Sequence, residues 1–283
     1  MSAALTQNSY GKSHVRLTKV IRKGAHHELI ELSANILLEG DFTDSYTTGD
    51  NAKIVATDSM KNTVYVLAKE NSFDNIETFA MQLAKHFTKT YPQVQATTID
   101  IEQTGWQRIA VDGKPHEHAF VAGGSDRRTC RARIEKKSDK VELTGGIAGL
   151  LVLKTTASEF WGFVSDRYRT LKDTKDRIFA TSVDATWIYS DERSDFNACY
   201  DSIRGALLKT FAMHHSLAVQ QTLLAMGESA LAACAAIRSI RLSMPNQHRI
   251  PFNLQPFGLE NANEIFVPMD EPFGLITGLV ERK

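Results

Sequence analysis

The sequence predicts an α+β protein in which helices cover one face of antiparallel sheet, built from two tandem ββααββ units. Three observations support this prediction. Long stretches are rich in β-branched residues, others place apolar residues at helical spacing, and the order strand, strand, helix, helix occurs twice. We place the units at residues 1–140 and 141–283, as a duplication of architecture and not of residue identity.

The first unit is expected to contain six elements, two strands, two helices and two more strands. They cover residues 14–23, 27–42, 58–70, 73–92, 93–109 and 118–137. Gly24 and Ala25 are expected to turn the first hairpin, and Asp74 to cap the second helix. The Gly123-Gly124 pair predicts a turn between strands.

The second unit repeats this order. Its strands are expected at 141–156, 176–191, 239–254 and 274–282, with a helical stretch over 196–236 that is interrupted near His214 to Leu217. Helices on one face leave the other sheet face and the edge strands exposed. We therefore expect the chain to associate with copies of itself.

Composition argues against several classes of partner. Lys and Arg total 33, as do Asp and Glu, so the formal net charge is zero and no broad attraction to nucleic acid or anionic lipid is expected. No stretch approaches the roughly 20 apolar residues of a membrane span, and the polar start lacks the core of a signal peptide. The end, Val280 to Lys283, carries no peroxisomal signal, which favours the cytoplasm.

Common catalytic and metal motifs are missing from the sequence. There is no GxGxxG after a strand, no GxxxxGK[ST], no HExxH and no GxSxG. The pairs His26-His27 and His214-His215 and the HxH of His116 and His118 lack a third ligand at a recognisable spacing, so surface histidines are the simpler interpretation. The cysteines are three and far apart, which fits reduced, inert thiols: Cys130, Cys199 and Cys234.

Position alone identifies few functional residues. Thr57 and Asp58 stand at a predicted helix start, where oxygen side chains ordinarily cap free N–H groups, although such amides can also hold an electron-rich ligand. Arg177 is by position an exposed strand charge. The remaining candidates are ordinarily solvated, packing or helix-surface side chains: Lys12, Phe160, Gln220 and His248.

Six segments together resemble the urate oxidase family, in that family's order and over almost the whole chain. They are YGKSHVRLTKV, GDNAKIVATDSMKNTVY, LVLKTTASEFWGF, LKDTKDRIFATSVDATW, VQQTL and SMPNQH. The resemblance implies the tunnelling fold, or T-fold, with two ββααββ units per chain. It also implies a homotetramer with active sites between subunits, and oxidation of urate by O2 to 5-hydroxyisourate and hydrogen peroxide in purine catabolism, without a cofactor or metal.

The resemblance also assigns roles by motif. The family's catalytic residues correspond to Lys12, Thr57 and His248. Its substrate-binding residues correspond to Thr57, Asp58 (through its backbone N–H), Phe160, Leu171, Arg177, Val219, Gln220 and Asn246. Gln221 is the neighbouring alternative to Gln220, which we prefer because it directly follows Val219 as in the family's VQ pair.

These residue types suit the implied chemistry. A guanidinium with a planar donor fork and an amide with both donor and acceptor can hold the edge of a flat purine anion, and a phenyl ring can stack on its face. The electrons come from urate itself, so the protein has to move protons and position oxygen. We expect Lys12, Thr57 and His248 to form a proton relay, with Asn246 near the oxygen or water.

The chain departs from the family pattern at a few positions, and two other functions are alternatives to urate oxidation. Ala157, Arg169 and Met244 replace residues common in the family, and the chain stops soon after its last strand. A related tunnelling-fold enzyme that opens a pterin or GTP ring would use zinc held by Cys and His. A protein that kept the fold as a binding or assembly module would have lost the activity, which the presence of Lys12 and His248 argues against.

Overall fold

The computed structural model describes residues 3–138 and 140–283. Two compact units can be distinguished: Met1–Gly146 with Asp191–Phe196, and Ile147–Ser190 with Asn197–Lys283. Strands are hydrogen-bonded in chain order, β1 to β8. Strand β5 (Val141–Lys154) begins in the first unit and ends in the second.

The first unit contains four further strands in an antiparallel arrangement. These are β1 (Tyr10–Lys23), β2 (His26–Gly40), β3 (Val94–Val111) and β4 (Lys114–Glu135). Gly24, with φ 63°, lies in the turn between β1 and β2, which confirms the predicted hairpin. Alternate side chains of β2 are buried because successive residues of a strand point to opposite faces: Leu32, Ala34, Ile36 and Leu38.

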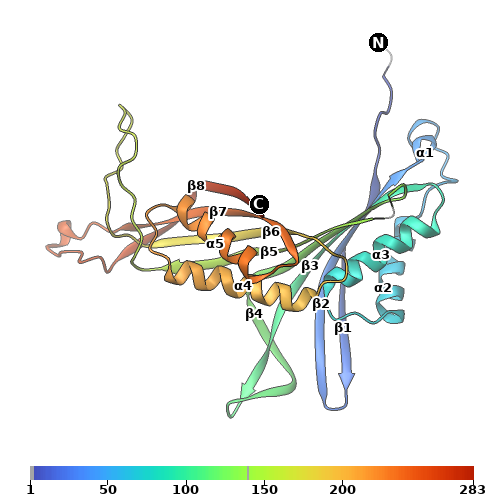
Figure 1. The fold of residues 1–283 in the computed structure, drawn as a ribbon, viewed down its shortest axis with the longest axis horizontal. Coiled ribbons are helices and arrows are strands. Elements are labelled where there is room, and N and C mark those ends of the chain that lie inside the picture. The colour runs from blue at the N-terminus through green and yellow to red at the C-terminus, as the bar shows by residue number, and fades with distance from the viewer. Residues whose placement is uncertain (1–2, 139) are drawn as a thin grey trace. The chain divides into compact units, whose positions relative to one another are not determined.

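Helices α2 (Thr57–Glu70) and α3 (Ile76–Thr90) follow the short helix α1 (Thr43–Thr47). Helix α3 packs on β3 and β4, and α2 packs on β1 (Figure 1). The apolar face of α3 is completely buried through Phe79, Leu83 and Phe87. Helices therefore cover one face of the first unit's strands, as the amphipathic pattern predicts.

A buried ion pair joins α3 to β4. The carboxylate of Glu77 is 0% exposed and accepts hydrogen bonds from Nη2 of Arg128 at 2.8 Å and from its Nε at 3.2 Å. The same guanidinium donates to the carbonyl of Phe196 at 3.0 Å. Because burying an unpaired charge is costly, this pair fixes which residues of α3 and β4 face each other.

Two local predictions in this unit are wrong. The turn between β3 and β4 lies at Asp112 and Gly113, both with positive φ, and β4 continues through Gly123 and Gly124 with a slip in its register to β3. The N-cap of α3 is Asn75 and not Asp74, because the Asn75 side chain accepts the N–H of Thr78 at 2.8 Å.

In the second unit, the rest of β5 is followed by β6 (Phe179–Tyr189), β7 (Ile237–Pro251) and β8 (Phe266–Glu281). Strands β6, β7 and β8 pair antiparallel. Strand β8 begins at Phe266, eight residues before the expected start at Gly274. It is an edge strand of the sheet, and an edge strand tolerates prolines such as Pro268 and Pro272. A 3-10 turn, η1 (Gln255–Phe257), lies in the β7–β8 connection.

The predicted interruption of the long helical stretch is confirmed. Helix α4 (Phe196–Met213) ends before His214, and α5 (Val219–Ala233) begins after Ala218. The ring of Phe211 in α4 lies 5.2 Å from that of Phe179 in β6, and α5 packs on β7 and β8. Helices thus cover one face of these strands too.

Large apolar side chains remain exposed on strands of both units. The most exposed include Val121 at 51% and Leu275 at 62%, together with Val111, Leu151 and Leu153. These residues lie on exposed strand positions, through which the sequence predicts self-association. Across the described ranges, no helix combines the length and apolar character needed to span a membrane.

Candidate active site

Lys12 lies near the start of β1, where two strands approach unusually closely. It pairs with Ile36 of β2, and a Cβ on the preceding Gly11 would lie only 1.7 Å from the Ile36 carbonyl oxygen. The ladder slips between Lys12 and Val15. Lys12 is half-buried, so its backbone and stem are held by the sheet.

The start of β1 is tied to the segment before α2. The Tyr10 hydroxyl donates to the Val55 carbonyl at 3.2 Å and accepts the Val55 N–H at 2.7 Å. Val55 is two residues before Thr57, so these bonds bring the region of Lys12 towards the first turn of α2. Lys12, Thr57 and Asp58 therefore lie on two segments of the first unit that these bonds join.

The predicted capping role of Thr57 and Asp58 is wrong. The N-cap of α2 is Ala56, which has no side-chain cap, and Thr57 is the first helical residue. Its hydroxyl is exposed and makes no hydrogen bond within the described ranges. The first N–H groups of a helix lack intrahelical acceptors, so this end presents free donors beside a free hydroxyl.

Asp58 bonds along its own helix. Its carboxylate accepts Lys61 Nζ at 2.5 Å and Asn62 Nδ2 at 3.0 Å. The hydrogen bond from Lys61 holds the pKa of Asp58 below its usual range, and the positive charge of Lys12 contributes in the same direction. Both cations favour the ionised form of this carboxylate.

The remaining predicted residues belong to the second unit, where residues 155–178 form a long arm between β5 and β6 (Figure 1). The Phe160 ring stacks on Phe163, with centroids 4.7 Å apart and planes 12° from parallel. The guanidinium carbon of Arg177 lies 5.1 Å from the centre of the Phe160 ring. The structure therefore brings Phe160 and Arg177 together at the base of the arm.

Arg177 is half-buried, so its interpretation as an exposed strand charge is wrong. Its backbone N–H donates to the Ser158 carbonyl at 2.9 Å. Its Nε is buried and finds no hydrogen-bond acceptor within residues 3–138 and 140–283. Burial lowers the pKa of this guanidinium. A buried donor without an acceptor costs about 1–3 kcal/mol, a cost that a bound acceptor would remove.

Val219 and Gln220 open helix α5. Val219 is buried, and Gln220 is exposed. The side-chain oxygen of Gln221 accepts the N–H of Leu217 at 3.0 Å, so Gln221 is used in the turn that starts the helix. This geometry supports Gln220 as the amide that is available to a ligand.

Backbone bonds connect the arm to the residues before α5. Ser158 forms a bridge with Ser216, in which the Glu159 N–H donates to the Ser216 carbonyl at 2.7 Å. The N–H of Ser216 returns a bond to Ala157 at 3.0 Å. Because Gln220 follows Ser216 by one turn, Phe160, Arg177 and Gln220 are held on mutually bonded segments.

Asn246 and His248 lie two residues apart on β7 and are both half-buried. Asn246 pairs with Thr181 of β6 and with Gly274 of β8, and the ladder to β8 slips between Asn246 and His248. Leu171 lies on the arm with 60% of its surface exposed.

The histidine groups found in the sequence are engaged in other contacts. The Arg108 guanidinium lies 2.8 Å from the ring nitrogen of His26 and donates to the backbone of His116. Among the described residues, no group of three or more His, Cys, Asp or Glu is arranged to hold a metal ion. Cys130, Cys199 and Cys234 are buried, and no disulfide joins any of them.

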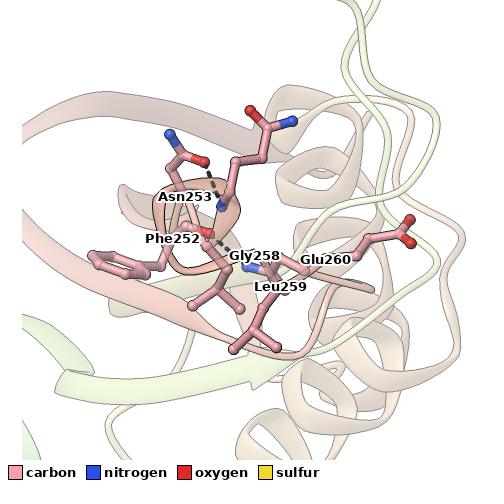
Figure 2. A pocket seen from close by; sticks show the side chains of 8 residues that line it. Phe252, Asn253, Gly258, Leu259 and Glu260 are labelled. Atoms are coloured by element: carbon pink, nitrogen blue, oxygen red, sulfur yellow. Dashed lines mark hydrogen bonds between the residues drawn. The ribbon is translucent and has the colours of Figure 1, made fainter.

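A hollow of about 680 Å³ lies in the β7–β8 connection, around η1. Figure 2 shows Phe252, Asn253 and Glu260 around it. None of the residues predicted for the site lines this hollow, so it is separate from the groups described above.

Sequence reasoning missed two polar residues that lie close in the chain to predicted site residues and contact each other. Glu159 precedes Phe160, and its carboxylate lies 2.7 Å from Nε2 of His215. His215 was considered only as a possible metal ligand. The signal that could have found them is an acidic residue beside the stacking ring in ASEFWGF and a histidine five residues before Gln220.

Comparison with known proteins identifies the family of this chain. A family model described as Uricase matches residues 8–133 and 143–277. A uricase from Arthrobacter globiformis is 45% identical over 279 residues, which cover 99% of this chain and 90% of that protein. A uricase from Aspergillus flavus is 38% identical over 295 residues, with 99% and 97% covered.

The crystal structure of the Arthrobacter globiformis uricase superposes with a TM-score of 0.94 at 44% identity, covering 100% of this chain and 96% of that one. A Bacillus sp. TB-90 urate oxidase shares the fold at a TM-score of 0.87 and 21% identity. These likenesses confirm the predicted fold class, the α+β tunnelling fold. With a family model over most of its length and relatives at this identity, the chain belongs to the uricase family, the urate oxidases.

Proposed function

We propose that this chain oxidises urate with O2 and water to 5-hydroxyisourate and hydrogen peroxide, as a step of purine catabolism. Two electrons pass from the urate anion to O2, which takes up two protons, and the oxygen of water becomes the new hydroxyl on the purine. No other redox group is needed for this balance, so we propose that the enzyme works without a cofactor or metal.

The observation that supports a urate site best is the environment of Arg177. Its Nε is buried and has no acceptor within the described ranges, and its guanidinium lies against the Phe160 ring. A flat anion that stacks on Phe160 would present oxygen acceptors to that donor fork. Gln220 supplies an amide donor and acceptor, and Val219, Leu171 and Asn246 complete the proposed lining.

Proton transfer is assigned to Lys12, Thr57 and His248. The Thr57 hydroxyl is exposed at the start of α2. Lys12 lies two residues after Tyr10, whose bonds to Val55 tie β1 to the residues before that helix. A nearby ammonium lowers the free energy of an alkoxide and so favours deprotonation of the hydroxyl. His248 then carries protons between urate, oxygen and water, and the backbone N–H of Asp58 binds the five-membered ring.

We further propose a homotetramer in which Lys12, Thr57 and Asp58 of one chain meet Arg177, Phe160 and Gln220 of a neighbouring chain. The exposed apolar side chains on the strands supply the surface that such an assembly would bury. Residues 1–140 and 141–283 are proposed as the two T-fold units. We propose the cytoplasm as the location of the protein, because three buried cysteines that form no disulfide suit a reducing compartment.

The test is a stoichiometric assay. Purified, chelator-treated protein is mixed with urate in air, and urate absorbance, O2 consumption and peroxide are followed together. Equal consumption of urate and O2 with an equal yield of peroxide is expected, and no reaction under nitrogen. A well-folded preparation that leaves urate unchanged in air contradicts the proposal, and urate loss that needs added metal contradicts the absence of a cofactor.

A further inference from the structure

The carboxylate of Glu159 contacts side chains from three separate segments of the second unit. Its Oε1 lies 2.7 Å from Nε2 of His215, in the linker between α4 and α5. Its Oε2 accepts Nε1–H of Trp161 at 2.6 Å and lies 3.8 Å from Nζ of Lys175. The Lys175 ammonium also lies 3.1 Å from the centre of the Trp161 ring, so two of the partners of Glu159 contact each other.

Each of these segments carries a residue of the proposed urate site. Trp161 directly follows Phe160, Lys175 is two residues before Arg177, and His215 is five residues before Gln220. The Glu159 side chain itself is only 16% exposed, although His215 and Lys175 are more than half exposed. The Glu159 carboxylate therefore joins the segments that carry Phe160, Arg177 and Gln220.

Backbone bonds hold the same segments independently of the Glu159 side chain. Phe160 and Thr174 exchange two N–H···O bonds of 2.9 Å, and Ser158 bridges Ser216. These bonds fix the chain path but do not by themselves fix the rotamers of the side chains that the segments carry. Charged hydrogen bonds, which are short and directional, are suited to remove that freedom.

The charge state of Glu159 is also set by this group. The hydrogen bonds from His215 and Trp161 hold the pKa of the Glu159 carboxyl below its usual range. The carboxylate is therefore ionised at neutral pH and serves only as an acceptor, with no proton to give to a substrate.

We propose that Glu159 is a positioning residue, which through His215, Trp161 and Lys175 sets the spacing of Gln220, Phe160 and Arg177 around a flat anionic purine. This inference rests on the proposed function. It predicts that loss of the carboxylate weakens binding of urate and of unreactive analogues alike, because the three side chains contact the ring system and not the reacting oxygen.

The experiment compares Glu159→Ala, Glu159→Gln and the parent chain for urate KM, urate kcat and the Kd of an unreactive xanthine analogue. Glu159→Ala is expected to raise KM and Kd together by about 10- to 100-fold, the usual cost of small misplacements, with kcat changed less than about threefold. Glu159→Gln keeps one acceptor oxygen but loses the charge and puts an NH2 donor in place of the second oxygen, so its KM and Kd are expected to lie between those of the parent and of Glu159→Ala. Glu28→Ala, which removes an exposed carboxylate paired with Lys23 at 2.8 Å, is the matched control and should leave all three constants unchanged.

The outcomes separate this inference from the proposed function. If the parent chain does not oxidise urate, both the proposed function and this inference are contradicted. If the parent is active and Glu159→Ala lowers kcat with KM unchanged, or changes neither constant, only the inference is overturned. Should Glu159→Ala not fold, His215→Ala and Trp161→Phe each remove one partner and are expected to raise KM. An unchanged KM in both would overturn the inference.

Discussion

Replacing Arg177 with lysine is expected to weaken purine binding by about 10- to 140-fold. Lysine keeps the positive charge but loses the planar fork, and with it the buried Nε donor that has no acceptor within the described ranges. A hydrogen bond that involves a charged group is worth about 1.5–3 kcal/mol, and each 1.4 kcal/mol corresponds to about tenfold in affinity. The loss of one such bond gives the stated range.

The assay is the Kd of an unreactive xanthine analogue, measured by calorimetry on folded protein, with the urate KM as a second measure. Arg167→Lys is the matched control, because the Arg167 guanidinium also lies over an aromatic ring of the arm, 4.6 Å from the Tyr168 ring centre. That control should bind within about twofold of the parent, since loss of one exposed cation–π contact costs little. If Arg177→Lys also binds within twofold, Arg177 does not hold the purine.

Three further predictions concern catalysis, the core and acid stability. Lys12→Met is expected to lower kcat by about 10²- to 10⁴-fold, the usual contribution of a general acid or base, and to change analogue Kd only slightly; near-normal turnover would rule out the relay. Arg128→Leu removes the cation bonded to the buried Glu77 and is expected to cost about 3–5 kcal/mol, measured by denaturant unfolding, where an unchanged midpoint would contradict it. A hydrogen bond from Arg133 holds the pKa of Glu39 below its usual range. This lowered pKa stabilises the fold above the ordinary carboxyl pKa of about 4.3, and the contribution is lost as the pH falls through the folded value. From about pH 5 to pH 3 the Tm of the parent should therefore fall more steeply than that of Glu39→Gln, and equal slopes would show that the pair contributes nothing.

The sequence was sufficient for the elements whose patterns are strong over many residues. The apolar spacing of α3, the break between α4 and α5 and the β1–β2 turn follow from local rules that burial reinforces. The family resemblance supplied the fold and the identities of the candidate residues, several of which position alone would assign to ordinary surface or packing roles.

Where the sequence misled, two local signals competed. A glycine pair is a turn signal, but Gly123 faces Gly105 across the ladder, with its Cβ position 3.3 Å from the Gly105 carbonyl oxygen. The pair therefore permits a close strand approach near a slip in register, while the turn forms at Asp112 and Gly113. The roles suggested for Glu159 and His215 depend on contacts between segments more than 50 residues apart, which no local pattern encodes.

Co-assembly of two inactive variants tests the central claim most directly, namely that one site combines Lys12 of one chain with Arg177 of another. Chains carrying Lys12→Met and chains carrying Arg177→Ala are made with different tags, co-expressed, and purified through both tags. Each variant alone should be nearly inactive. In mixed assemblies formed at random, roughly a quarter of the sites would hold both native residues, so urate-dependent peroxide formation should return to about that fraction of the parent rate. Mixed assemblies that contain both chains but remain as inactive as either variant alone would contradict the account.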